Sequence, residues 1–279
     1  MAEIATRVAE LRARLGAPDF APGRTVMVPT MGALHDGHLS LVRRARELGS
    51  RVVVSIFVNP TQFAPHEDFA AYPRGLETDL AKLEGLADIV FAPGAAEMYP
   101  EGFATTISVG GPTAGLESDF RPHFFAGVAT VVAKLLLAAR PDAAVFGEKD
   151  YQQLLVVKRL AKDLGLATEI VGAPTLRESD GLAMSSRNAY LDPRERAVAG
   201  RLNGTLKEVI RRAGEPRAAE AWGEAALKQA GFDSVDYVAI RDAETLAVAE
   251  TLDRPARVLA AARIGRTRLI DNMPVQSTR

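Results

Sequence analysis

Runs of apolar residues alternate along the first two thirds of the chain with segments whose apolar side chains recur at helical spacing. The runs predict strands at 25–28, 51–58, 88–91, 143–146 and 167–171, with a weaker candidate at 105–109. The other segments predict helices at 4–15, 39–48, 76–86, 128–139 and 152–164. Continuous β-branched runs are typical of strands buried on both faces. The alternation therefore predicts an α/β fold, a Rossmann-like parallel sheet with helices on both faces.

The pattern changes near residue 172. Few helix signals occur in residues 173–187. Later segments predict helices near 193–212, capped by Asp192, and up to Ala230, and strands at 235–240, 257–264 and 267–270. We therefore expect two domains with a boundary near residue 175: a Rossmann-like domain of residues 1–175 and a smaller C-terminal α+β domain of residues 176–279.

Composition restricts the possible partners. The 279 residues, 47% of them hydrophobic, can bury a large core. A net charge of −1 gives no electrostatic footprint for nucleic acid, and the absence of cysteine excludes disulfides and thiolate chemistry. The longest apolar stretch, 128–139, is shorter than the roughly 20 residues that cross a bilayer, and the N-terminus lacks the pattern of a secretion signal. We expect a cytoplasmic protein with no nucleic-acid and no membrane partner.

The tetrapeptide His35-Asp36-Gly37-His38 lies between a predicted strand and a predicted helix. If His38 opens that helix, the two imidazoles lie on neighbouring surface of its first turn. Unpaired backbone N–H groups and the positive end of the helix dipole would then hold a polyphosphate. A single histidine near a strand end is usually a satisfied polar residue, but the pair in this context predicts a nucleotide site.

Two further segments suit phosphate. Gly147-Glu148-Lys149-Asp150 follows a predicted strand, and in parallel sheets ligands bind at the carboxyl ends of strands. Lys149 could offset charge on an α-phosphate, and Asp150 could accept hydrogen bonds from ribose hydroxyls. A solvated charged turn would have the same sequence pattern. Met184-Ser185-Ser186-Arg187 offers two hydroxyls and a guanidinium, which predicts a phosphate clamp, with a plain polar loop as the alternative.

Uncharged amides supply candidates for substrate recognition. Asn59 and Gln62 follow the strand predicted at 51–58, and Gln153 follows the lysine segment. Amides donate to carboxylates and hydroxyls without adding charge, although Gln153 could equally be a solvated residue of a first helical turn. Neither a dinucleotide fingerprint nor a P-loop occurs, which disfavours hydride transfer and P-loop hydrolysis.

Four segments in this order, 29–38, 57–63, 146–153 and 180–188, closely resemble the pantothenate synthetase family of pantoate–β-alanine ligases. The first and last are also similar to the His-x-Gly-His and Lys-Met-Ser-Lys-Ser signatures of the wider nucleotidyltransferase superfamily. The resemblance spans nearly the whole chain. It implies ATP-dependent condensation of (R)-pantoate with β-alanine to pantothenate, AMP and diphosphate through a pantoyl adenylate, with Mg²⁺ and a homodimer.

The resemblance also implies residue roles. His35, His38 and Lys149 would be catalytic, with His38 the family's general acid, although we favour hydrogen-bond donation to the phosphates. Gln62 and Gln153 would bind pantoate with Asn59 nearby, Asp79 would bind the metal, and the C-terminal domain would cover the active site. ATP would contact Met31, Gly32, Ala33, Leu34, His35, Asp36, Gly37, His38, Gly147, Glu148, Lys149, Asp150, Leu176, Met184, Ser185, Ser186 and Arg187.

Two other functions fit the same motifs. One is a nucleotidyltransferase that leaves the nucleotide on its product. The other is a nucleotide-binding regulatory module without turnover. The sequence also departs from the family pattern, because Phe124 stands where a histidine is expected and Leu136-Leu137 where Phe-Asn is usual. For this reason we assign no role to His123.

Overall fold

The computed structural model describes residues 2–20, 22–64 and 69–276. The chain divides into two compact units. The first comprises residues 1–148 and 156–174, and the second comprises residues 149–155 and 175–279. The boundary expected from the sequence places residues 149–155 in the first domain, whereas the structure groups them with the second unit.

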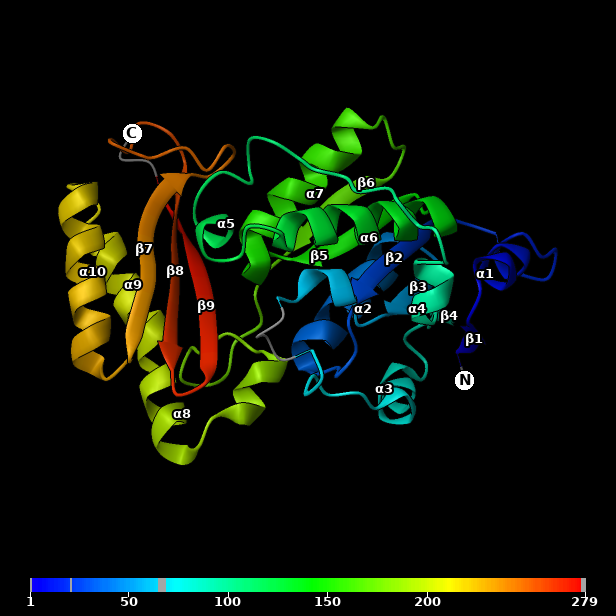
Figure 1. The fold of residues 1–279 in the computed structure, drawn as a ribbon, viewed down its shortest axis with the longest axis horizontal. Helices are drawn as coiled ribbons and strands as arrows, with labels where there is room; N and C mark the ends of the chain where they lie inside the picture. Colours follow the sequence, from blue (N-terminus) through cyan, green and yellow to red (C-terminus); the bar gives the residue numbers. More distant parts are fainter. Residues whose placement is uncertain (1, 21, 65–68, 277–279) are drawn as a thin grey trace. The chain divides into compact units, whose positions relative to one another are not determined.

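The first unit is built on a six-stranded parallel sheet with the strand order β1-β4-β3-β2-β5-β6 (Figure 1). From the central strand β2 the chain passes to β3 on one side and later to β5 on the other. In α/β sheets, ligands bind at the carboxyl ends of the strands beside such a reversal, which here are β2 and β5. The strands are β1 (Glu3–Ala5), β2 (Thr25–Thr30), β3 (Arg51–Ile56), β4 (Ile89–Phe91), β5 (Ala143–Gly147) and β6 (Glu169–Ala173).

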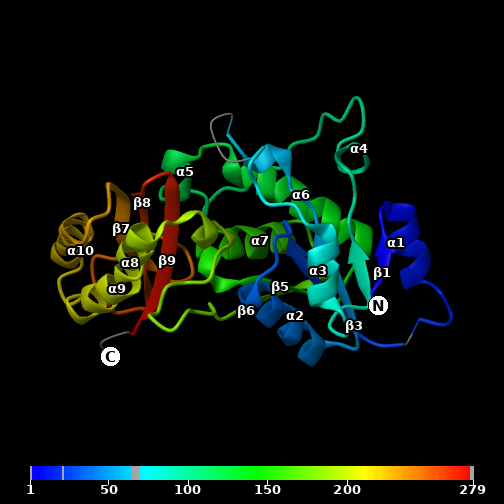
Figure 2. The same ribbon diagram turned by 90° about the horizontal axis from the view of Figure 1, so that it is seen from below.

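Helices cover both faces of this sheet. Val26, Val28, Val52 and Val54 pack in one core cluster with the apolar face of α2 (Asp36–Leu48). The alternate strand residues point to the other side, where the almost wholly buried α6 (Phe124–Ala139) lies (Figure 2). The unit also contains α1 (Val8–Leu15), α3 (Leu76–Leu83), α4 (Ala95–Met98), α5 (Glu117–Phe120) and the 3₁₀ turn η1 (Pro60–Gln62). The predicted parallel α/β architecture is confirmed.

The second unit contains a three-stranded antiparallel sheet, β7 (Ser234–Asp242), β8 (Ala256–Ile264) and β9 (Thr267–Val275). Its helices lie against this sheet (Figure 1). The core cluster joins apolar side chains of the strands to Leu202, Leu206 and Leu227 from the helices. The helices are α8 (Pro193–Ala199), α9 (Arg201–Arg211) and α10 (Pro216–Ala230), and the 3₁₀ turn η3 (Ser186–Tyr190) precedes them. The remaining elements, the 3₁₀ turn η2 (Glu148–Asp150) and the helix α7 (Tyr151–Asp163), are each divided between the two units.

Several predicted boundaries were wrong, each for a non-local reason. The helix predicted at 4–15 begins only at Val8, because residues 3–5 pair with β4. No strand forms at 105–109, where the backbone N–H of Ile107 donates to the Thr130 hydroxyl on α6. The helix predicted at 193–212 is broken at Gly200, whose hypothetical Cβ would lie 2.5 Å from a carboxylate oxygen of Asp180.

Candidate functional site

The two histidines of the His35-Asp36-Gly37-His38 motif cap α2 reciprocally. The helix begins at Asp36 with His35 as its N-cap, one turn earlier than predicted. The Nδ1 atom of His35 accepts the backbone N–H of Gly37 at 3.1 Å, and Nδ1 of His38 accepts that of His35 at 3.3 Å. This arrangement reproduces a capping box with imidazoles in place of a hydroxyl and a carboxylate. The two ring centroids are therefore held 4.1 Å apart.

These contacts fix the protonation pattern of both rings. A backbone N–H always donates, so each Nδ1 must be an unprotonated acceptor. A neutral imidazole with an accepting Nδ1 carries its proton on Nε2. In both His35 and His38 the Nε2 atom is consequently a hydrogen-bond donor.

The turn before the histidines is held by one buried carboxylate. Gly32 and Ala33 adopt positive φ values of 80° and 51°, which is strained for the alanine. Asp79 on α3 accepts the N–H of Ala33 at 2.9 Å and that of Leu34 at 2.8 Å. Lys82, one turn later on α3, donates to the Leu34 carbonyl. The first turn of α3 thus fixes the turn that follows β2.

Several of the backbone N–H groups that were expected to be unpaired at this turn have partners within the protein. Besides the N–H groups held by Asp79 and by the two imidazoles, that of Gly32 donates to the Thr30 hydroxyl at 3.2 Å. The folded turn satisfies its own donors because buried N–H groups without partners are costly. The two imidazoles and the positive end of the α2 dipole lie together at this turn.

The burial and the hydrogen bonds of the Asp79 carboxylate do not suit a magnesium ligand. Its side chain belongs to a residue that is 2% exposed, and each carboxylate oxygen already accepts a backbone N–H. Magnesium prefers several water ligands and only one or two carboxylates. Among residues 2–20, 22–64 and 69–276, no group of three or more His, Cys, Asp or Glu side chains is arranged to hold a metal ion.

The amide candidates of the first unit lie together. Asn59 is 1% exposed and caps η1. Its oxygen accepts from the hydroxyls of Thr61 and Tyr99, and its nitrogen donates to the Gln62 side-chain oxygen at 2.8 Å and to the Gly127 carbonyl at 3.2 Å. Asn59 therefore has a supporting role, which orients the Gln62 amide so that its nitrogen is the end able to donate to a substrate.

The surroundings of this amide pair are tightly packed. A Cβ on Gly127 would lie 2.4 Å from the Thr61 carbonyl oxygen, so only glycine allows α6 to approach η1 this closely. Burial raises the pKa of the Tyr99 phenol, partly offset by its hydrogen bonds to Thr61 and Asn59. Tyr99 thus remains a neutral donor at physiological pH. No local pattern in the sequence predicts this role of Tyr99.

In the second unit, Lys149 lies in a short polar segment. Its ammonium group is 3.8 Å from the Asp150 carboxylate, and its backbone carbonyl accepts the side-chain N–H of Asn272 at 2.8 Å. Gln152 is buried, whereas Gln153, the predicted substrate residue, is partly exposed. The Tyr151 hydroxyl donates to the Ala243 carbonyl.

The predicted clamp follows a small hairpin. The Met184 N–H donates to the Leu176 carbonyl at 3.0 Å, so these two predicted ATP residues are neighbours. Ser185 caps η3 and its hydroxyl accepts the N–H of Arg187. Arg196 binds the hairpin through Asp180, and its hydrogen bonds hold the pKa of that carboxyl below the ordinary value.

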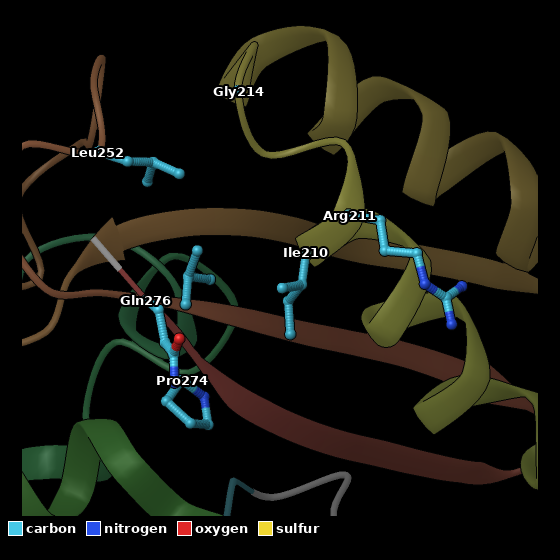
Figure 3. A pocket seen from close by; sticks show the side chains of 7 residues that line it. Ile210, Arg211, Gly214, Leu252, Pro274 and Gln276 are labelled. Atoms are coloured by element: carbon cyan, nitrogen blue, oxygen red, sulfur yellow. The ribbon is translucent and has the colours of Figure 1, made fainter. Parts of the chain in front are cut away.

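The structure therefore gathers the predicted residues into two sets. In the first unit, the segment 31–38 lies with Asp79, and Asn59 lies with Gln62. In the second unit, Leu176 lies beside Met184 in the segment that continues to Arg187. A separate cavity of about 560 Å³ between the end of α9 and the end of β9 is lined by none of the predicted residues (Figure 3).

In the described part of the chain, no helix has the length and apolar character to cross a membrane.

Comparisons with known proteins agree over nearly the full length. The family model described as pantoate-beta-alanine ligase matches residues 3–274. Pantothenate synthetases of Mesorhizobium japonicum and Paramagnetospirillum magneticum are 60% and 58% identical, each with 98% of both chains covered. The crystal structure of pantothenate synthetase from Thermus thermophilus superposes with a TM-score of 0.92 at 49% identity, covering 98% of this chain and 99% of that one. A Francisella tularensis pantoate-beta-alanine ligase complexed with beta-gamma ATP and beta-alanine superposes with a TM-score of 0.83 at 33% identity, covering 98% and 97%.

Proposed function

From the premise that this chain belongs to the pantoate–β-alanine ligase family, we propose how its residues carry out the family's reaction. The chain is an ATP-dependent acid–amine ligase that condenses pantoate with β-alanine to pantothenate. In the first step a pantoate carboxylate oxygen attacks the α-phosphorus of ATP and diphosphate leaves. In the second step the β-alanine amine attacks the acyl carbon of the adenylate and AMP leaves.

We assign His35 and His38 to the phosphates as hydrogen-bond donors. The observation that carries this assignment is the reciprocal cap, in which both Nδ1 atoms accept backbone N–H groups. To act as a general acid, either ring would need a proton on Nδ1 as well, which would break its capping bond. Two neutral Nε2–H donors instead stabilise charge that develops on the leaving diphosphate.

The remaining roles follow from side-chain chemistry. Lys149 and the segment 184–187 are proposed to contact the ATP phosphates with charged and hydroxyl donors. Gln62 is proposed to donate its amide N–H to pantoate, in the orientation set by Asn59. Gln153 is a second proposed pantoate contact, and Asp150 a contact for ribose hydroxyls.

Isotopic ATP–diphosphate exchange in the presence of pantoate tests these assignments, because exchange requires only the first step. We expect His38→Ala and Lys149→Ala to lose exchange by about 100- to 1,000-fold, as for other removed oxyanion donors, while far-UV circular dichroism stays unchanged. Wild-type exchange rates in a folded variant would refute the role of the residue replaced.

The finer expectations are also proposals. We propose that Mg²⁺ arrives on the phosphate oxygens of ATP with water as its other ligands, so that chelation by EDTA abolishes turnover. A cytoplasmic homodimer is expected from the family resemblance and is tested by cell fractionation and analytical ultracentrifugation. A nucleotidyltransferase that retains nucleotide on its product is not favoured, because the relatives are ligases. AMP release only when both pantoate and β-alanine are present distinguishes the two activities.

A further inference from the structure

Two adjacent residues of β9, Asp271 and Asn272, contact both segments of the second unit that we assign to ATP. They are 2% and 3% exposed. The Asn272 side-chain nitrogen donates to the Lys149 carbonyl at 2.8 Å. The Asp271 carboxylate binds Arg177, at the start of the hairpin that leads to Arg187, with N–O distances of 2.7 and 2.9 Å.

The two partners of the Asn272 side chain suit an amide. Its side-chain oxygen accepts from Nε of Arg257, and its side-chain nitrogen faces the Lys149 carbonyl. A guanidinium only donates and a carbonyl only accepts, so the residue between them must supply one acceptor and one donor. The Arg257 guanidinium is itself fixed 3.8 Å from the centre of the Tyr151 ring. Lys149 is thus tied to β9 through its main-chain carbonyl, whereas its ammonium group faces the Asp150 carboxylate at 3.8 Å.

Asp271 acts on the other segment in a similar way. Its bidentate pair with Arg177 is a strong and directional contact. The same guanidinium also donates to the carbonyl of Gly181 at the hairpin tip and to that of Asn272. The hairpin closes with the bond from Met184 to Leu176. The start and the tip of the hairpin that leads to the clamp are therefore both held to one point of β9.

We propose that Asp271 and Asn272 are positioning residues for catalysis, which set the main chain of Lys149 and of the clamp segment relative to each other. This inference rests on the proposed function, in which both segments contact ATP. The geometry predicts that loss of the Asn272 donor displaces Lys149 without removing it. When a catalytic group in an active site is displaced by 1 Å, the reaction rate falls by about 100-fold.

A double-mutant cycle on ATP–diphosphate exchange tests the proposal. Asn272→Asp keeps the size of the side chain but replaces the donor by an acceptor that repels the Lys149 carbonyl. We expect a loss of about 10- to 100-fold in the exchange rate at saturating ATP, and no further loss when the same change is made in Lys149→Ala. The matched control is Thr267→Val, a buried change on β9 at a hydroxyl that has no hydrogen-bond partner among the described residues; it should retain the wild-type rate.

Each outcome decides a different point. A wild-type rate in Asn272→Asp, or an equal further loss in the Lys149→Ala background, would overturn the inference but leave the proposed function standing. A wild-type rate in Lys149→Ala would instead refute the proposed role of the lysine, and the inference with it. If Asn272→Asp does not fold, Asn272→Ser, which is uncharged and too short to reach both partners, should show the same loss. For Asp271→Asn we expect a raised KM for ATP, and an unchanged KM would refute its role.

Discussion

Removal of the Asp79 carboxylate should destabilise both the first unit and the turn that follows β2. The carboxylate accepts two backbone N–H groups, one of them from Ala33 at a positive φ. Hydrogen bonds to a charged group contribute about 1.5–3 kcal/mol each, so Asp79→Ala should cost about 3–6 kcal/mol in the free energy of unfolding. Asp79→Asn keeps one acceptor oxygen and should cost roughly half as much. Either loss is a large part of the 5–15 kcal/mol typical of a domain.

Urea denaturation followed by fluorescence measures this loss, with Glu77→Gln as the matched control. Glu77 is an exposed carboxylate in the first turn of the same helix, so its neutralisation should change stability by less than about 0.5 kcal/mol. In the absence of urea, where Asp79→Asn is folded, we expect a reduced rate of ATP–diphosphate exchange. The dependence of this rate on Mg²⁺ should be unchanged. A wild-type unfolding midpoint together with a raised Mg²⁺ requirement would refute the structural role and identify Asp79 as a metal ligand.

Three further changes test other parts of the description. Gln62→Glu keeps the acceptor oxygen but loses the donor, so the KM for pantoate should rise while that for ATP stays constant; equal effects on both would contradict the assignment. Gly127→Ala places a methyl group against the Thr61 carbonyl and should cost about 1–3 kcal/mol, and an unchanged melting temperature would show that α6 can move away. Because hydrogen bonds from Arg196 lower the pKa of Asp180, the stability that this pair contributes is complete above the unfolded value near 3.8 and is lost only as pH falls through the lower folded value. NMR titration should therefore give a midpoint below 3.8 for this carboxyl, which Arg196→Gln should raise; an equal midpoint in both proteins would exclude the contact.

The sequence predicted the elements whose burial is uniform. β2, β3 and β5 are continuous apolar runs, and α2 carries its apolar residues at helical spacing, so periodicity alone located them. It failed where a distant partner decides the structure, as at residues 3–5, which pair with β4. Local propensity contains no information about such a partner.

The sequence predicted the motifs of the candidate site but not the distant residues that hold these motifs in place. Glycine and histidine in a short motif after a strand carry a recognisable chemistry, and so does a lysine after another strand. The contacts of Asp79 with Ala33, and of Asn272 with Lys149, join residues 46 and 123 positions apart. A single buried aspartate or asparagine in a helix or strand has no local pattern that would reveal such a contact. For this reason no sequence pattern predicted the contacts of Asp79 or of Asn272; the expected metal role of Asp79 came from the family resemblance.

The imidazole caps of α2 have a consequence for inhibitor design. Since the backbone fixes which nitrogen of each ring bears hydrogen, a compound that approaches the two imidazoles meets two adjacent donors. Sulfonyl, phosphonate or carboxylate oxygens would match this surface, whereas a protonated amine or an amide N–H placed there would leave both rings unsatisfied. Compounds that carry such paired oxygens should accordingly be favoured in a screen over cationic analogues of similar shape.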